Sequence, residues 1–213
     1  MEIYRTLTAG MVMMLLSFGI QAGEWVQKYK KEGIEVYTRE IQGSDFLEFR
    51  GETTLDQPLS SIVSMMWTVE DMPKWMFGVK KAELVSPNNG FDRQLYFVNA
   101  APFPLKDRDL TVTNYVSQNP QTLTTRCIMK LVDSPLKSDY VRVAKMDGFI
   151  DLIPQGVGKT KVVYQAHIEA GGSVPAWTAN MYALDNPLHT LKGMRKLMAE
   201  KQYSANLAIV DYK

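Results

Sequence analysis

The longest regular hydrophobic pattern lies near the C-terminal end of the chain, after the segment Gly171–Pro175. Apolar or aromatic residues recur there in steps of three and four: Trp177, Met181, Leu184, Leu188, Leu191, Met194, Leu197 and Met198. This spacing predicts one helix of about seven turns with a continuous apolar stripe. Ser173 is placed to cap it, and Pro175 suits its first turn. Because the stripe keeps its phase across Pro187, we expect a kink there and not a break.

Short runs of alternating apolar and polar residues fill most of the chain upstream of this helix. They predict strands at Ile34–Arg39, Phe46–Thr54, Val79–Val85, Arg93–Ala100, Leu110–Val116, Leu123–Leu131, Tyr140–Lys145, Gly148–Ile153 and Lys161–Glu169. Turn-forming residues such as Pro87–Gly90 separate them. The hairpin-sized gaps between consecutive strands favour one antiparallel sheet, so the expected fold class is α+β.

Two further helices are predicted before the sheet is complete. Glu24–Glu32 has the pattern of a short amphipathic helix with Gly33 as its C-terminal stop. A second helix follows Asp56 as its N-cap, with Pro58 in its first turn. Its expected buried face consists of Leu59, Ile62, Val63 and Met66. Clustered Trp67, Trp75 and Phe77 after it suit a core corner or the lining of an apolar pocket.

The sheet and the long helix leave two arrangements open. The strand at Lys161–Glu169 has one apolar face made of Val162, Tyr164, Ala166 and Ile168, and such a face must be covered. Either the long helix fills the space and completes a solid core, or it closes a cavity that the sheet lines. Methionine is abundant, and it adapts to irregular ligands as well as it fills gaps in a core.

Composition narrows the chemistry that the chain can perform. The 213 residues are 46% hydrophobic and 22% charged, with a net charge of +1, which gives no reason to expect nucleic acid as a partner. Two histidines and one cysteine do not supply a Cys/His metal cluster or a disulfide framework. We expect no cofactor, no metal and no catalytic residues, with His167 exposed and His189 facing the pocket or solvent.

The N-terminal segment differs from the rest of the chain. Ala9–Ile20 is apolar apart from Gly and Ser, is too short to span a bilayer comfortably, and precedes a small residue at Ala22. This pattern predicts a secretory signal peptide over residues 1–22, with an uncleaved anchor as the alternative. A single domain would then cover residues 23–213, secreted across the inner membrane and periplasmic if the source is Gram-negative.

One connection between predicted neighbouring strands is unusually long. Ala100–Asp109 is apolar and proline-rich at first and charged at its end. Loops of this kind more often carry function than shorter ones do, and this one could be an Ω-loop packed by its own side chains.

The order of these signals resembles a START (StAR-related lipid-transfer) domain of the helix-grip, Bet v 1-like superfamily, in a bacterial exported form. The resemblance rests on Trp25, Gly33–Arg39, Gly43-Ser44, Trp75, Pro102–Leu105 leading into Arg108-Asp109, Val141-Arg142, Gly148–Pro154, Thr160–Tyr164 and Gly171–Trp177. It implies a curved antiparallel sheet wrapped around the C-terminal helix, with a lipid-sized tunnel inside. The loop Ala100–Arg108 would match the family's Ω-loop and would gate the tunnel together with the helix.

The resemblance also implies a function. Members of the family bind a lipid or another hydrophobic small molecule in the internal cavity, and are generally not enzymes. We therefore expect binding, with carriage between membranes, transient membrane contact and a monomeric state. One alternative is a polyketide cyclase/aromatase-like enzyme of the same superfamily, which predicts titratable residues converging in the cavity. Another is a small-molecule sensor or an interaction module.

Candidate ligand-binding residues come from the sheet, the loop and the long helix. Strand parity aims Arg142 inward, as a headgroup contact or as half of a structural ion pair. In some sterol carriers of the family an acidic residue pairs with an arginine here, but that position falls near Asn99, so we infer no sterol specificity. Arg108 and Asp109 are expected to fix the loop exit. The full set is Arg142, Asn99, Trp177, Met181, Leu184, Leu188, Tyr164 and Phe103.

Overall fold

A computed structural model describes residues 22–86, 90–133, 136, 138–204 and 207–212. These residues form ten strands and four helical segments. The strands are β1 Val26–Lys31, β2 Ile34–Arg39, β3 Glu48–Leu55, β4 Val79–Leu84, β5 Asp92–Asn99, β6 Arg108–Gln118, β7 Thr125–Val132, β8 Val141–Arg142, β9 Lys145–Pro154 and β10 Thr160–Glu169. The helices are α1 Leu59–Trp67, the 3₁₀ turn Val69–Asp71, α2 Met72–Trp75 and α3 Ala176–Glu200. The predicted signal peptide lies outside the described residues, apart from Ala22.

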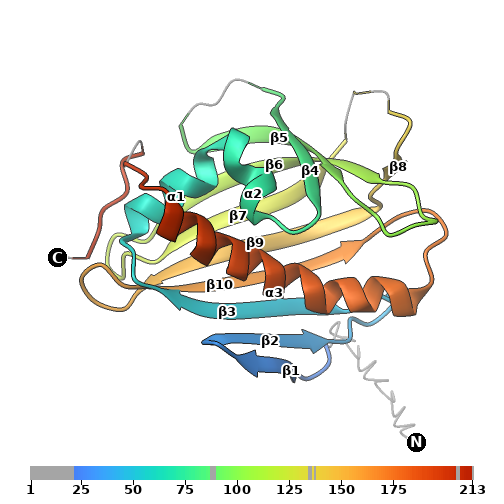
Figure 1. Cartoon of the computed structure of the whole chain (residues 1–213), viewed down its shortest axis with the longest axis horizontal. Coiled ribbons are helices and arrows are strands. Elements are labelled where there is room, and N and C mark those ends of the chain that lie inside the picture. The colour runs from blue at the N-terminus through green and yellow to red at the C-terminus, as the bar shows by residue number, and fades with distance from the viewer. Residues whose placement is uncertain (1–21, 87–89, 134–135, 137, 205–206, 213) are drawn as a thin grey trace, which may run out of the picture.

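One curved sheet contains all the described strands (Figure 1). Its order is β1-β2-β3-β10-β9-β7-β6-β5-β4, with antiparallel neighbours throughout, and the short β8 pairs in parallel with the start of β6. The helices α1, α2 and α3 all lie on the concave face of the sheet, and α3 runs along its length. The predicted α+β, helix-grip architecture is confirmed. None of the described helices is long and apolar enough to cross a membrane.

The first predicted helix is wrong, because residues Val26–Lys31 form the edge strand β1. Glu32 and Gly33 both have positive φ, 55° and 69°, and their tight turn pairs Lys31 directly with Ile34 of β2. Gly33 therefore ends a hairpin turn and not a helix. Val26 is 51% exposed. Lysines along this edge oppose pairing with another chain.

The helix starts differ from the predicted caps. Pro58 and Pro175 occupy the N-cap positions of α1 and α3, and neither helix has a side-chain cap at its start. Asp56 and Ser173 are therefore not the caps, because the extended backbone continues past each of them to the proline that directly precedes the helix. The predicted inner face of α1 is confirmed, because Leu59, Ile62, Val63 and Met66 are all buried. The long helix continues through Pro187, as predicted.

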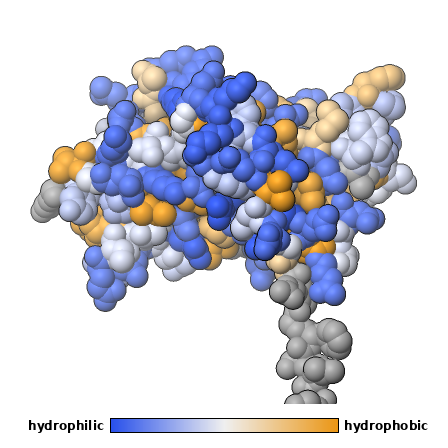
Figure 2. Space-filling view, turned by 90° about the horizontal axis from the view of Figure 1, so that it is seen from below, coloured by the Kyte–Doolittle hydropathy of each residue, from blue (hydrophilic) through white to orange (hydrophobic). Residues whose placement is uncertain are grey.

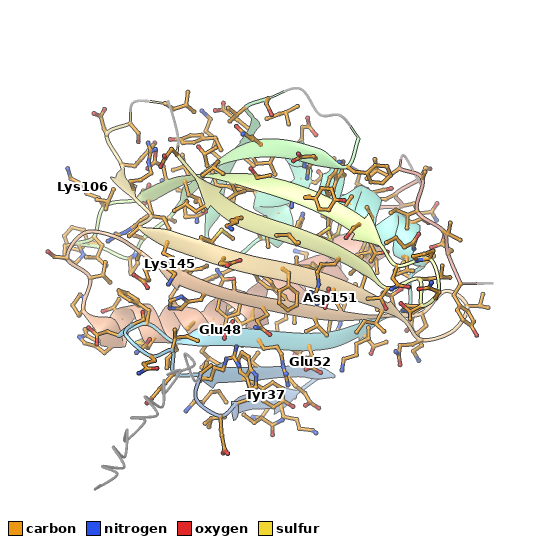
Figure 3. The ribbon with its side chains drawn as sticks, turned by 180° about the vertical axis from the view of Figure 1, so that it is seen from behind. Tyr37, Glu48, Glu52, Lys106, Lys145 and Asp151 are labelled. Carbon is orange, nitrogen blue, oxygen red and sulfur yellow. The ribbon has the colours of Figure 1, made fainter. Side chains whose placement is uncertain are left out.

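The two faces of the sheet have opposite chemistry. Concave-face residues such as Ile150, Leu152 and Val162 are fully buried under the helices. The convex face carries ion pairs between neighbouring strands, including Arg126 with Asp151 at 2.6 Å and Lys161 with Glu52 at 2.7 Å (Figure 3). The surface on the side of β1 and β2 is also mainly hydrophilic, with scattered apolar residues (Figure 2). The main core therefore lies between the concave face and the helices.

Two glycines let the chain approach itself closely around α3. Gly51 of β3 faces the helix, and an added Cβ would lie 2.8 Å from Cβ of Pro187 and 2.9 Å from Cδ1 of Leu191. Gly171, between β10 and α3, has φ of 70°, and an added Cβ would lie 2.1 Å from the Arg142 carbonyl oxygen. These contacts seat the middle of α3 on the sheet and fix the sharp entry into the helix.

Candidate ligand-binding cavity

A cavity of about 520 Å³ lies at one end of the concave face, partly open to solvent. Its walls come from β3, the 100–107 loop, the end of β10 and the first half of α3. Apolar residues dominate the lining, among them Phe46, Leu47, Phe49, Leu105, Val143, Ile168 and Val174. The volume is within the range of about 300–1,000 Å³ that is typical of sites for one small organic ligand. Under α1 and α2, toward the opposite end of the concave face, the described residues enclose a void of about 10 Å³.

The first half of α3 leaves this space open because its inward side chains are small. Thr178, Ala179 and Ala183 line the cavity, together with Tyr182 and Asp185. The predicted apolar stripe is buried only farther along, where Leu188, Leu191, Met194, Leu197 and Met198 pack in the core. Trp177 and Met181, at the start of the stripe, are 69% and 59% exposed. The small residues four apart at Ala179 and Ala183 were the sequence signal for a cavity, and we missed it.

Phe77 forms the wall between the cavity and the packed core. Its ring lies 5.0 Å from the ring of His189 and 5.4 Å from the ring of Tyr182, both on α3. Its backbone N–H donates to the Thr190 hydroxyl at 3.1 Å. Burial raises the pKa of Tyr182 to about 12, so its hydroxyl stays neutral. The aromatic cluster predicted around Trp67, Trp75 and Phe77 thus divides: both tryptophans are core, and Phe77 lines the cavity.

The 100–107 loop covers the mouth and is held at both ends. The Ala100 N–H donates to the Gly78 carbonyl at 2.7 Å, and the Ala101 N–H donates to the Asp107 carboxylate at 3.1 Å. Lys80 also binds Asp107 at 2.7 Å, and this hydrogen bond holds the pKa of Asp107 below its usual range. Phe103 at the tip is 98% exposed. The loop therefore has fixed ends and an apolar tip directed to solvent.

Asn99 and Arg108 are polar groups inside this apolar lining. They stand opposite each other where β5 and β6 meet the loop, and both line the cavity. The Arg108 side chain donates through Nη1 to the Lys106 carbonyl, while its Nε has no hydrogen-bond partner among the described residues. The Oδ1 of Asn99 is also buried without a partner there. Both atoms are thus buried beside the cavity, next to the parts of Arg108 and Asn99 that line it, without a hydrogen-bond partner among the described residues.

Arg142 points away from the cavity, which corrects the parity argument. Its guanidinium pairs with Asp109 at 2.9 and 3.0 Å, and Tyr96 donates to the same carboxylate at 3.1 Å. Asp109 is fully buried and follows Arg108, so strand alternation places it on the opposite face of β6. The predicted inward orientation is wrong because it assumed one continuous strand from Arg142 to Ile150. β8 and β9 are separate strands, so the alternation of faces along β9 does not extend to Arg142. Arg142 and Asp109 fix the loop exit.

The structure brings only part of the predicted ligand-binding set to the cavity. Asn99 and Met181 line it. Tyr164 and Leu188 are buried in the neighbouring core, with Leu184 packed against it. Phe103 and Trp177 are exposed beside the mouth, on the loop and at the start of α3. Ligand contact by any of them stays a prediction. Arg108, Tyr182 and Phe77 line the cavity and were not in the set.

Neither Cys127 nor His167 lines the cavity. Cys127 is fully buried in β7, and burial raises the pKa of its thiol to about 12, which leaves it unreactive. His167, predicted to be exposed, is 6% exposed instead. Its Nε2 lies 3.2 Å from both the Ser44 hydroxyl and the Phe46 carbonyl, because the segment before β3 folds over this part of the convex face.

Comparison with known proteins agrees with this architecture. The family model of the START domain matches residues 11–202. The chain belongs to the START domain family. A STAR-related lipid transfer protein from Xanthomonas axonopodis has 29% sequence identity and a TM-score of 0.76, over 82% of this chain and 98% of that one. Human STARD10 shares the START fold at 18% identity and a TM-score of 0.72, over 83% and 73% of the two chains.

A bacterial relative is also similar in sequence. An uncharacterized protein of Pseudomonas aeruginosa is 31% identical over 182 residues, which cover 85% of this chain and 89% of the relative. The START domain assignment therefore agrees with the sequence resemblance, and the described cavity lies between the sheet and the C-terminal helix, as the resemblance implied.

Proposed function

We propose that this START domain binds a lipid or another hydrophobic small molecule in the 520 Å³ cavity and carries it between membranes. The observation that carries the proposal is the cavity itself, an apolar space left open by small residues of α3 beside an otherwise solid core. Burying each methylene of a ligand there is worth about 0.8 kcal/mol. A lipid chain can thus leave a membrane when the cavity covers most of its length.

Lipid extraction tests this proposal directly. The protein is purified from a host that exports it, extracted with organic solvent, and the extract is analysed by mass spectrometry. Binding of a fluorescent fatty acid and of its methyl ester to the purified protein is measured in parallel. Binding of either probe, or a co-purified lipid in about equimolar amount, supports the proposal. An empty extract together with no probe binding would overturn it.

Two exposed side chains beside the mouth support transient membrane contact. Phe103 at the loop tip and Trp177 at the start of α3 are 98% and 69% exposed, and neither packs on the domain core. Inserting two such side chains into a bilayer surface would strengthen binding at least about tenfold. The loop and the first half of α3 also line the cavity, so contact there would place the mouth at the lipid.

Co-sedimentation with phosphatidylcholine vesicles tests the membrane contact. We expect the F103S/W177S variant to bind at least about tenfold more weakly than the natural protein. The control is F91S. Phe91 is an exposed residue just before the start of β5, at the end of that strand far from the 100–107 loop, so F91S should bind the vesicles as the natural protein does. Equal binding by all three proteins would remove this part of the proposal.

The enzymatic alternative has less support than binding. A cyclase would need converging acid and base groups, and the charged residues of the described lining are Arg108 and Asp185. We therefore propose that the protein is a binder without catalytic activity, acting as a monomer.

We also propose that the protein is exported across an inner membrane. The apolar run before Ala22 supports secretion across an inner membrane, and a lipid carrier in the periplasm would work between two bilayers. Cell fractionation with an antibody against the native protein, followed by N-terminal sequencing, tests both location and cleavage. Recovery only from the cytoplasm with residues 1–22 intact would refute export.

A further inference from the structure

Arg108 begins β6, directly across from Asn99 and beside the loop that covers the cavity. Its side chain lines the cavity and is only 8% exposed. A guanidinium keeps its charge at all ordinary pH values, and leaving such a charge buried without a counter-ion costs several kcal/mol. Proteins therefore pair a buried arginine with a carboxylate or place it where a ligand brings the negative charge.

No described carboxylate lies within ion-pair distance of Arg108, although the charge of Arg108 helps to lower the pKa of Asp107. The neighbouring Asp109 points to the opposite face of the sheet and is bound by Arg142 and Tyr96. Asp107 is bound by Lys80 and by the Ala101 N–H. Asp185, the other charged residue of the lining, is partly exposed and forms no ion pair with Arg108. The two nearest acidic residues in sequence are thus taken by other partners.

The polar atoms of Arg108 and Asn99 without a described partner indicate the chemistry of a suitable ligand. Arg108 Nε is a charged donor that no described group accepts, and Asn99 offers an amide beside it. The oxygen and nitrogen of an amide can exchange places by a flip, so Asn99 can present a donor or an acceptor to the same group. Arginine binds oxyanions such as carboxylate and phosphate with particular strength. The remaining lining is mainly apolar, apart from Thr178, Tyr182 and Asp185, and this suits a hydrocarbon chain attached to that oxyanion.

We propose that Arg108, assisted by Asn99, binds the oxyanion of a single-chain acidic amphiphile whose apolar chain fills the cavity. The inference rests on the proposed lipid-binding function and names the ligand class for it. A cavity of about 520 Å³ favours one chain over the two chains of a bilayer phospholipid. A carboxylate and a phosphate monoester share the chemistry that Arg108 recognises.

Two probes that differ only in charge test the proposal on the natural protein. These are cis-parinaric acid, a fluorescent fatty acid, and its methyl ester. We expect the acid to bind at least about tenfold more tightly, the usual effect of one charge-assisted hydrogen bond. Competition by oleate, oleoyl lysophosphatidate and inorganic phosphate separates the sources of the oxyanion. Displacement by either lipid supports the proposal, and displacement by phosphate alone overturns the requirement for a chain.

Substitutions locate the effect. Arg108→Met should reduce affinity for the acid about tenfold and leave the ester within about twofold, and Arg108→Lys should retain part of the preference. Lys106→Met, which removes an exposed charge from the same loop, is the control and should bind both probes normally. Equal binding of acid and ester by the natural protein would overturn the acidic-ligand proposal and leave lipid binding intact. Binding of neither probe would overturn both.

Discussion

The two ends of the concave face each contain a buried arginine, and the arginines differ in how they are bound. At the closed end, Arg93 donates to the carbonyls of Trp67 and Met66 at 2.7 and 2.9 Å and to Asn114 at 3.1 Å. Its guanidinium also lies 4.0 Å from the Trp67 ring. At the open end, the Arg108 side chain donates one hydrogen bond among the described residues, to the Lys106 carbonyl, and its Nε lacks a described partner.

The difference assigns separate roles to the two ends. Arg93 completes the last turn of α1, whose terminal carbonyls have no helical partner, and thereby joins the helix to β5. Helices α1 and α2 close that end to a void of about 10 Å³, about enough for one water molecule. The open end instead keeps a cavity between the sheet, α3 and the 100–107 loop, and we propose that its arginine binds a ligand there. We therefore expect stability to depend mainly on the closed end, and recognition on the open end.

Replacing the two arginines should separate these roles most clearly. Arg93→Met removes the donor that binds two backbone carbonyls and the Asn114 side-chain oxygen in the core, so we expect a loss of about 3–5 kcal/mol in the free energy of unfolding. Arg108→Met removes a charge without stranding comparable partners and should cost less than about 1 kcal/mol. Urea unfolding of both variants measures the contrast. Similar losses would show that the ends do not differ in this way.

Acid should weaken the closed end through Asp71, which is 2% exposed. Its burial alone would raise its pKa, but hydrogen bonds from Lys201, Lys74 and Tyr203 outweigh burial and hold the pKa below the usual range. Because the folded pKa is below the unfolded value of about 3.9, the contribution is complete above that pH and is lost as the pH falls further. We expect Asp71→Asn to cost about 2 kcal/mol at pH 7.

The test is urea unfolding between pH 3 and pH 7. The natural protein should lose stability toward pH 3 more steeply than Asp71→Asn does, since the variant has no carboxylate to protonate. Asp107→Asn, at the exposed loop of the open end, is the control and should change the curve little, because solvent screens its pair with Lys80. Parallel curves for the natural protein and Asp71→Asn would contradict the role of Asp71.

Packing of α3 on the sheet should be less sensitive than these polar groups. Gly51→Ala places a Cβ within 2.9 Å of both Pro187 and Leu191, so the helix must shift. We expect a loss of about 1–2 kcal/mol in the free energy of unfolding. Leu191→Ala added to Gly51→Ala tests the cause, because it removes one of the two clashing side chains. The double variant should lose less than the sum of the two single losses, and strict additivity would exclude a direct clash.

These contrasts also explain which parts of the fold were predictable from the sequence. Strand β2 was predicted with its observed bounds, and α1 with its buried face, because each has one apolar face in a regular period. The edge strand β1 was mistaken for a helix because its exposed residues have no burial period, and a two-residue turn decided its pairing. Edge strands depend on their neighbour, and local sequence does not contain that information.

The site was less predictable than the fold for a related reason. Its defining residues are small or unpartnered, whereas hydrophobic periodicity identifies residues that fill space. The apolar stripe of α3 predicted the packed half of the helix and placed Trp177 and Met181 on a buried face that they largely leave. Likewise, Arg108 and Arg142 look alike in sequence, and only the register of β6 with β5 and β8 decides which one faces the cavity.

Filling the cavity should have the smallest effect on stability and should remove binding. Ala179→Phe directs a ring into open space on α3, so it gains apolar contact without displacing packed atoms, and we expect less than about 1 kcal/mol change in stability. Binding of cis-parinaric acid and of its ester should both be lost, since the ring occupies the volume that either chain needs. Ala199→Phe, at an exposed position late in the same helix, is the matched control and should bind both probes. If Ala179→Phe instead destabilises the protein as much as Gly51→Ala does, the open end is packed in solution, and the division of roles between the two ends fails.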